Sequence, residues 1–528
     1  MTRDPEDMSV NAQHSTGLRL LRRRSGPNSY VFSTGVVVGV LVTGLALPYI
    51  IGDAGTDTVT AGNTAGSPST SAQGDIVAAD EGTGAVGSAT GPGSGSPAEG
   101  ASAAPARVSG AAASGSAAGG GGGTAGSGSG TAERGVLPNR IKLGFTLIDV
   151  ATVGRVGGNA AIDPEQQRAA AQSFVDEINE RGGINGRMIE PHYRVYDILS
   201  RDDTRAACLE LADDKKVFAV IASLTYPSPI LCFVKEKQMP LFNLLPNNAQ
   251  YLYDDAQGRL FTLYPGSHRM MEVFAAELDA LGKLKGKHIG ILSDDDNDPG
   301  SQVSKDLESI LRRRGHQSIS QGHTPASLDG TASQNPIIVN NFKRDGVEIV
   351  LMLMGTSVRG TQFAQAAESQ QATWTYAVTD FTSNFSDSGA QQMPRSFTNA
   401  VLITGTRMGE FRDPNRPESS TAKACKAIYE SRSSRKLAAW GTNEYALTMN
   451  FCDALTYFER AATTAGTGLT AATLNAGVQS LGPVPSASLG GGAFGPGKPD
   501  MNDLVRHSTW QFSCTCWMPV DQFHPGRG

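Results

Sequence analysis

Hydroxyl side chains that could bind a small molecule gather in a short segment before a predicted helix. Ser223, Thr225 and Tyr226 follow the apolar run 218–222 and precede a helix that we predict over 227–237. The beginning of a helix carries unpaired backbone N–H groups and a partial positive charge, which suits a carboxylate or another anion. The segment therefore predicts an anion-binding loop, with Tyr226 packed against an apolar part of the ligand. The alternative is that the hydroxyls only cap the helix and that Tyr226 is structural.

Amide side chains follow the next predicted strand, 241–245. Asn243 and Asn247 lie in the loop 243–248, where they could add amide and backbone contacts to the same ligand. A plain turn is the alternative interpretation of this loop.

Other patterns imitate known sites but lack a required residue. Residues 492–498 fit G-x-x-x-x-G-K, but Pro499 replaces the Ser or Thr of a phosphate loop. The aspartates of 294–298 imitate a calcium loop, but Pro299 stands where glycine is required, so we predict a strand end and a helix start. The eight histidines show no metal-ligand spacing, and no nucleophile is paired with a base. We therefore expect a protein that is not an enzyme and has no metal or cofactor.

Charge and composition divide the chain into unlike parts. The 528 residues include 45 Lys+Arg and 51 Asp+Glu, a net charge of 45 − 51 = −6. A nucleic-acid-binding protein would need a basic face, so we exclude that class of partner. The 62 glycines indicate one low-complexity part beside a globular part.

The N-terminal third predicts a membrane anchor. After a polar segment, 1–29, residues 30–52 carry no charge and would form a helix of roughly 34 Å, enough to span a bilayer core of about 30 Å. Four arginines precede it, so residues 1–29 are expected in the cytoplasm and the rest outside, on a single-pass anchor in the cell membrane. A cleaved signal peptide is the alternative, although no A-x-A site follows closely.

Residues 53–136 are almost entirely Gly, Ala, Ser, Thr and Pro, without an aromatic residue. Such a segment buries too little apolar surface to offset the entropy of ordering, which predicts a disordered linker. Two interpretations of this linker fit its composition: a tether with an end-to-end distance of about 50 Å, or a filler whose length is not under selection.

The globular part, residues 137–528, alternates strand-like and helical segments. This order predicts parallel sheets with helices on both faces. A helix is expected to start at Asp163 as N-cap, with Pro164 at N1 and a capping box to Gln166. The predicted strands are 141–147, 189–196, 218–222, 241–245, 288–293, 347–354, 376–379, 401–404 and 508–519. The other predicted helices are 201–213, 227–237, 267–281, 300–314, 358–370, 420–431, 441–465 and 470–481.

Two motifs resemble the type I periplasmic binding proteins, in particular the branched-chain amino-acid-binding branch. The first is EIN at 177–179 followed by GGINGR at 182–187, and the second is KVFAVI at 216–221 followed by MPL at 239–241. The resemblance covers about 138–519. It implies an α/β fold with two doubly wound parallel-sheet lobes, joined by a three-segment hinge, that close on a small molecule.

The resemblance also implies one acidic ligand residue. In the family an acidic residue after a second-lobe strand receives the ligand's amine, and Asp380 is the matching position, with Thr356 on the same side. A solvated or capping aspartate is the alternative. If Asp380 and the 223–226 loop both bind, the ligand is zwitterionic, an amino acid or a relative. If only the loop binds, an organic acid or an amide fits equally well.

Six cysteines in an exported domain suggest disulfides. Cys208 lies on one predicted helix and Cys232 on the next-but-one element, so adjacent helices could bring them together and we expect them to pair. Four others remain, namely Cys425, Cys452, Cys514 and Cys516. We expect Cys514 and Cys516 not to bond to each other but each to meet one of the remaining two; buried free thiols are the alternative.

These observations favour a membrane-anchored solute-binding protein that delivers a small polar ligand to an ABC permease. The alternatives are a membrane-tethered ligand sensor, for which 29 cytoplasmic residues leave little room, and a non-catalytic envelope scaffold on the same binding fold.

Overall fold

The computed structural model describes residues 133–149, 163–198, 200–224, 226–246, 248–294, 299–325, 328–355, 357–382 and 386–528. These residues belong to one compact unit, 119–528. The predicted cytoplasmic segment, membrane helix and nearly all of the linker lie outside the described residues. Among the described helices, none has both the length and the apolar character needed to cross a membrane.

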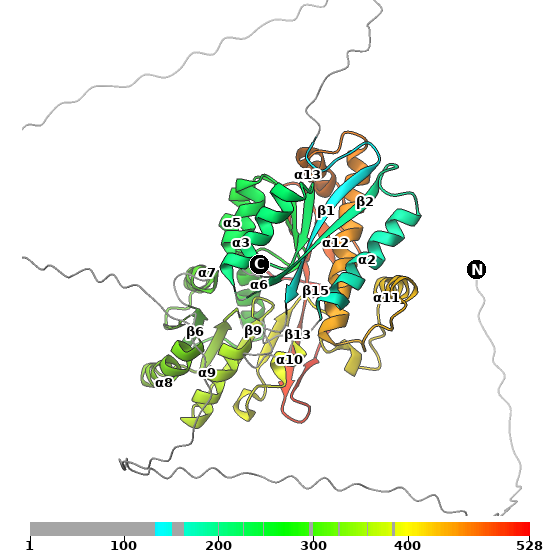
Figure 1. The fold of residues 1–528 in the computed structure, drawn as a ribbon. Coiled ribbons are helices and arrows are strands. Elements are labelled where there is room, and N and C mark those ends of the chain that lie inside the picture. Colours follow the sequence, from blue (N-terminus) through cyan, green and yellow to red (C-terminus); the bar gives the residue numbers. More distant parts are fainter. Residues whose placement is uncertain are drawn as a thin grey trace, which may run out of the picture. The chain divides into compact units, whose positions relative to one another are not determined.

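The first lobe contains a five-stranded parallel sheet with the order β2-β1-β3-β4-β5 (Figure 1). Its strands are β1 (Arg140–Asp149), β2 (Met188–Asp197), β3 (Ala219–Ala222), β4 (Leu241–Asn243) and β5 (Leu260–Thr262). The connecting helices are α2 (Pro164–Glu180), α3 (Arg201–Leu209), α4 (Pro227–Leu231) and α5 (Gln250–Ala256). Three later helices return to this lobe, α11 (Ser420–Ser433), α12 (Asn443–Ala465) and α13 (Ala471–Gln479).

Alternating side chains of this sheet pack on two helical layers. On β3, Ala219 and Ile221 join the core that includes α2 and α12, whereas Val220 and Ala222 join the core under α3, α4 and α5. Every residue of β3 is buried, as expected for a parallel strand covered on both faces.

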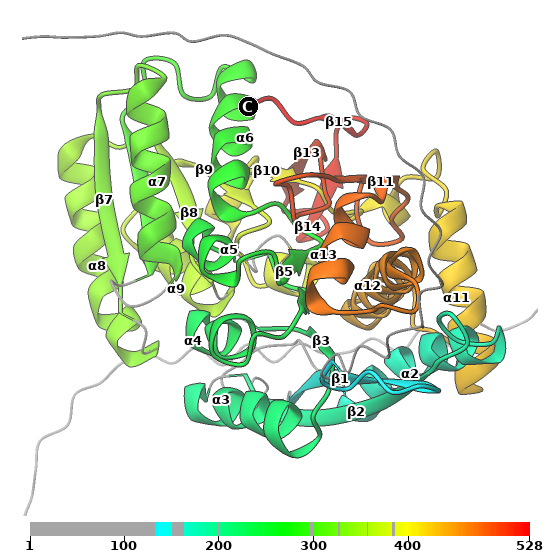
Figure 2. The same ribbon diagram turned by 90° about the horizontal axis from the view of Figure 1, so that it is seen from above.

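The second lobe contains a mixed sheet with the order β14-β13-β10-β9-β8-β6-β7 (Figure 2). Its strands are β6 (Ile289–Asp294), β7 (Ile319–Thr324), β8 (Ile349–Leu353), β9 (Thr375–Thr379), β10 (Val401–Thr404), β13 (Leu504–Gln511), β14 (Cys516–Pro519) and β15 (His524–Pro525). The helices are α6 (Ser267–Ala280), α7 (Pro299–Arg313), α8 (Leu328–Asp345), α9 (Ser357–Ser369) and α10 (Asp387–Ala390). β6 to β10 are parallel, whereas β13 and β14 are antiparallel.

The chain passes between the lobes three times, through segments 263–266, 405–419 and 480–503, and these crossing segments touch. Asn502 donates its N–H to Leu263 O at 3.1 Å, and Gly490 donates its N–H to Gly405 O at 2.7 Å. A Cβ on Gly405 would lie 2.1 Å from Asn502 Nδ2, so only glycine allows this approach. The third segment also forms a small hairpin, β11 (Gly482–Val484) and β12 (Gly492–Phe494).

Several sequence predictions need correction. Strands β5 and β7 and helices α5 and α8 were not predicted; β5 has only three residues, and β7 is a half-buried edge strand with few apolar residues. The segment 508–519 is a hairpin rather than one strand. Asp163 caps α2 and Pro164 stands at N1, as predicted. The cap accepts the N–H of Glu165 at 3.0 Å, and Gln166 donates to Glu444 instead of closing a capping box.

All six cysteines form disulfides, but only one pairing was predicted correctly. Cys208 bonds to Cys232, as expected. Cys425 bonds to Cys452 and joins α11 to α12, and Cys514 bonds to Cys516. The prediction for the last four was wrong because it placed Cys514 and Cys516 on one extended strand, whereas the chain turns there, with Thr515 in a left-handed conformation at φ 47°.

Candidate functional site

Ligands of open α/β sheets lie outside the carboxyl ends of the strands. In the first lobe this position is occupied by the residues after β3 and β4, and in the second lobe by those after β6, β8 and β9. Of the residues that we predicted as ligand contacts, Ser223 and Tyr226 follow β3, Asn243 is the last residue of β4, and Asp380 follows β9. Thr225, Asn247 and Thr356 lie outside the described residues and remain predictions.

Ser223 and Asn243 are both buried inside the first lobe. The N–H of Ser223 donates to Thr146 Oγ1 at 3.3 Å, and its carbonyl accepts the hydroxyl of Tyr196. Asn243 accepts the Leu224 N–H at 2.9 Å and donates from Nδ2 to Leu224 O at 3.0 Å. These contacts fix the loop that follows β3. Both residues therefore hold the predicted site in place through hydrogen bonds inside the first lobe.

Asn243 also connects the two predicted loops. Its Nδ2 donates to Asn248 Oδ1 at 2.8 Å, and Asn248 Nδ2 donates to Leu245 O at 2.7 Å. The loop after β3 and the loop after β4 are therefore one hydrogen-bonded unit.

Tyr226 is half-buried at the N-cap of α4, and the Arg201 guanidinium lies 5.1 Å from its ring centroid. The first turn of α4 contains Pro227 and Pro229, which have no N–H group. Fewer backbone donors are therefore present than the anion-binding hypothesis assumes, and the helix has only five residues. The Arg201 guanidinium beside Tyr226 is a cation that sequence reasoning did not consider.

Asp380 is buried at the end of β9, where both of its carboxylate oxygens are engaged. Oδ1 accepts the hydroxyl of Thr404, and Oδ2 accepts the Gly405 N–H at 2.6 Å. Burial raises the pKa of Asp380 to about 6, although these hydrogen bonds and the positive charge of Arg506 oppose the increase. With 3% of the residue exposed, Asp380 holds the second crossing segment against β9 in this conformation.

A buried ion pair at the carboxyl end of β6 was not predicted. Arg359 Nη1 lies 2.5 Å from Asp294 Oδ1, and Gly355 donates its N–H to Asp294 Oδ2 at 2.8 Å. The pair joins the ends of β6 and β8 to the first turn of α9. The Asp294 side chain is only 3% exposed and the Arg359 side chain 10%. Sequence reasoning recognised Asp294 as a strand end but treated Arg359 as an ordinary helix residue, since the two are 65 positions apart.

A second buried carboxylate holds the third crossing segment. Asp453 of α12 accepts the Ala487 N–H at 2.8 Å and hydroxyl donations from Ser486 at 2.6 Å and Ser488 at 2.7 Å. Burial raises the pKa of Asp453, against the effect of these hydrogen bonds. The first lobe thus holds this segment through α12.

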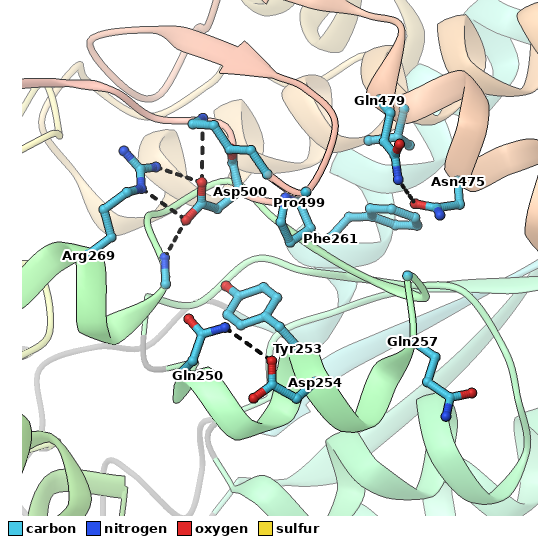
Figure 3. A pocket seen from close by; sticks show the side chains of 15 residues that line it. Gln250, Tyr253, Asp254, Gln257, Phe261, Arg269, Asn475, Gln479, Pro499 and Asp500 are labelled. Atoms are coloured by element: carbon cyan, nitrogen blue, oxygen red, sulfur yellow. Dashed lines mark hydrogen bonds and ion pairs between the residues drawn. The ribbon is translucent and has the colours of Figure 1, made fainter. Parts of the chain in front are cut away.

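A cavity of about 440 Å³ lies at the β5 edge of the first sheet, beside the hinge (Figure 3). Arg269 Nη2 lies 2.6 Å from Asp500 Oδ1, and the Gly266 N–H donates to Asp500 Oδ2 at 2.7 Å. Lys498 lies 3.1 Å from Asp503 and in a turn rather than before a helix, in agreement with the rejection of a phosphate loop. Arg269 and Lys498 both face Asp500, and the cavity lies beside the edge strand β5; we assign no ligand to it.

Solved structures of solute-binding proteins share this fold at low sequence identity. One is an ABC transporter substrate-binding protein from Desulfitobacterium hafniense in complex with Leu, with 16% identity, coverage of 72% of this chain and 100% of that chain, and a TM-score of 0.52. Another is a solute-binding protein from Rhodopseudomonas palustris in complex with 3,4-dihydroxybenzoic acid, with 12% identity, coverage of 74% and 98%, and a TM-score of 0.54. A fatty acid ABC transporter substrate-binding protein from Thermomonospora curvata has 14% identity, coverage of 74% and 94%, and a TM-score of 0.52.

No curated protein sequence matches the chain. The sequence model of the family described as periplasmic binding protein, in contrast, matches residues 147–504, which is more than half of the chain. Together with the two lobes and their three crossing segments, this match shows that the chain belongs to the periplasmic binding protein family, as its type I resemblance predicted.

Proposed function

We propose that the protein is the substrate-binding component of an ABC importer and that it captures a small carboxylate-bearing ligand between its lobes. Proteins of this family bind solutes and are not enzymes, in agreement with the sequence prediction. The three adjacent crossing segments that join the two lobes can act as a hinge, so that the lobes close around the ligand.

The observation that carries the ligand class is the Asp294–Arg359 pair. A planar guanidinium can bind a carboxylate through two parallel hydrogen bonds. Because Arg359 lies at the carboxyl ends of β6 and β8, a modest shift of the pair on closure would offer its guanidinium to an anion. Arg201 beside Tyr226 supplies a second cation on the first lobe.

The ligands of the similar solved structures support the same class. Two of these structures hold Leu and 3,4-dihydroxybenzoic acid, and the third protein is named for fatty acid transport; all three compounds are carboxylic acids. The carboxylate therefore defines the proposed ligand class, and an amine is an optional addition. Residues 30–52 and 53–136 complete the proposal as an anchor and a tether that keep the binding domain outside the membrane.

Matched ligands separate the two charged groups of an amino acid. Full-length protein, purified in detergent, is titrated with leucine, with leucinamide, which lacks the carboxylate, and with 4-methylpentanoate, which lacks the amine. Ligand at 100 times its dissociation constant should stabilise the protein by about 2.7 kcal/mol, which thermal unfolding and calorimetry both detect. We expect the carboxylates to bind and the amide to fail; binding of leucinamide alone would refute the carboxylate proposal.

The contribution of the guanidinium is tested with Arg359→Lys and Arg359→Met. Lysine keeps the charge but loses the two-point geometry, so we expect at least tenfold weaker binding for Lys and loss of binding for Met. Arg344→Met, on an exposed end of α8, is the matched control and should bind normally. Circular dichroism of each variant identifies any general unfolding.

A further inference from the structure

Two histidines and a glutamate from distant parts of the chain meet under the C-terminal end. Ligand atoms of Glu277 in α6, His507 in β13 and His524 in β15 all lie within 4.8 Å of one another. Glu277 is fully buried, with Oε2 3.1 Å from His507 Nε2 and Oε1 3.8 Å from His524 Nδ1. In a tetrahedral zinc site the ligand atoms are about 3.4 Å apart, so small side-chain movements suffice to place an ion between them.

The two ring nitrogens of His507 both face carboxylates. Nδ1 lies 2.6 Å from Asp521 Oδ2, and the backbone N–H of His507 donates to Asp521 Oδ1 at 2.7 Å. When Asp521 accepts the Nδ1 proton, a singly protonated ring leaves a lone pair on Nε2 toward the Glu277 carboxylate, where a metal ion fits between them, whereas a doubly protonated ring donates to Glu277 directly.

Many metal sites contain the same arrangement of a carboxylate beside a ligating histidine. A histidine that binds a metal through one nitrogen usually donates its other N–H to a carboxylate, which fixes the ring orientation. Asp521 holds this position for His507. The two imidazole rings are 5.2 Å apart between centroids. His524 Nε2 is buried and lies 3.7 Å from Asp521 Oδ2, and His524 Nδ1, which faces Glu277, also lies 3.1 Å from the Pro525 carbonyl oxygen, a contact that zinc would replace.

Arg527 is the group that a metal would have to displace. Its backbone N–H donates to Glu277 Oε1 at 2.9 Å, and its guanidinium contacts Glu277 Oε2. The Arg527 side chain is 54% exposed, so its guanidinium can turn into solvent at small cost. The C-terminal end itself lies beside α6 (Figure 2).

We propose that Glu277, His507 and His524 form a Zn²⁺ site with Asp521 as the orienting carboxylate and Arg527 as its competitor. Two imidazoles and one carboxylate are ligands that zinc accepts, and water would complete the tetrahedron. The ion would connect α6, which follows the first crossing segment, to β13, which follows the third. Zinc binding would thereby stiffen the hinge side of the second lobe.

The test uses the full-length protein without a histidine tag, after treatment with a chelator. Calorimetric titration with Zn²⁺ should show one ion per chain and a higher unfolding temperature, and Co²⁺ should give the visible absorption of a tetrahedral site. His524→Ala should abolish this binding, and Asp521→Asn should weaken it about 10–100-fold. His316→Ala, which removes another histidine paired with an aspartate in the same lobe, should bind zinc normally.

The Arg527→Gln variant distinguishes a zinc site from a purely structural cluster, because the two interpretations predict opposite results. If the site binds zinc, removal of the competing guanidinium frees the Glu277 carboxylate and tightens zinc binding. If the cluster is only a latch for the C-terminus, with His507 doubly protonated, the same variant destabilises the protein and binds no zinc. Absence of stoichiometric binding, or binding that His524→Ala leaves unchanged, would refute the proposal.

Discussion

The carboxylate of Asp380 accepts the Gly405 N–H at 2.6 Å, which joins the end of β9 to the segment through which the chain leaves the second lobe. The family resemblance matched Asp380 to the residue that receives a ligand's amine, but its described contacts are with Thr404 of β10 and with Gly405 of the second crossing segment. This geometry makes Asp380 a hinge-positioning residue in the present conformation. Contact with a ligand amine would require at least one of these hydrogen bonds to open.

The raised pKa of Asp380 predicts how the stability of the protein depends on pH. Burial raises the folded-state pKa to about 6 from 3.8. The folded protein therefore binds this proton more tightly than the unfolded chain, and the free energy of unfolding should decrease as pH rises from about 4 to 6, by roughly 3 kcal/mol from this group. Below pH 4 and well above pH 6 this contribution is constant.

Asp380→Asn isolates that contribution. The Thr404 hydroxyl can accept from the new amide and donate to Thr406, whose Oγ1 is 2.7 Å away, so we expect the variant to fold. Urea unfolding between pH 4 and 7 should show the wild type losing its advantage over the variant as pH rises. Parallel stability profiles for the two proteins would contradict the prediction.

Asn243 should contribute mainly to stability. Asn243→Ala leaves the buried N–H and C=O of Leu224 without partners, each at a cost of about 1–3 kcal/mol. We expect urea unfolding to show a loss of about 2–5 kcal/mol, with weaker ligand binding as a secondary effect of the disordered loop. Gln302→Ala, on the exposed face of α7, is the control and should change stability by less than about 0.5 kcal/mol. A variant as stable as the wild type but without ligand binding would instead identify Asn243 as a direct contact.

Gly405→Ala should disturb the hinge. The added methyl group would meet Asn502 Nδ2 at 2.1 Å and the Leu504 carbonyl at 3.2 Å, so the Asn502 side chain, which lies between the second and third crossing segments, must shift. We expect a loss of about 1–3 kcal/mol and an altered distribution of open and closed conformations in small-angle scattering. Gly495→Ala, where a Cβ would meet nothing within 4 Å, should leave both properties unchanged.

The three disulfides should differ in accessibility and in contribution to stability. Cys514 is exposed, whereas Cys208 and Cys232 are fully buried, so mild reduction followed by alkylation and mass spectrometry should label the 514–516 bond first. Removing Cys425–Cys452, which closes 27 residues, should cost about 3–4 kcal/mol in the chain-entropy model, against about 1–2 kcal/mol for Cys514–Cys516. Equal labelling of all six cysteines would contradict the predicted order.

The family signature could be recognised from the sequence alone because its residues interact with near neighbours in the chain. Asn179 Nδ2 donates to Ile189 O at 2.9 Å and its Oδ1 accepts the Ile189 N–H at 2.7 Å, only ten positions along the chain. Gly183 and Gly186 adopt positive φ angles in the turn between α2 and β2. Local contacts of this kind impose residue types at fixed spacing, and alternating strands and helices are recognised for the same reason.

Tertiary structure decided which polar residues meet. Asp294 and Arg359 are 65 positions apart, and Glu277 and His507 are 230 apart, so no spacing rule predicts either contact. Asp380 follows β9 and Asn243 ends β4, but only the fold shows that loop and crossing-segment atoms occupy their polar groups. A sequence records which groups are available at a strand end, whereas long-range packing determines whether each group faces a ligand or another part of the chain.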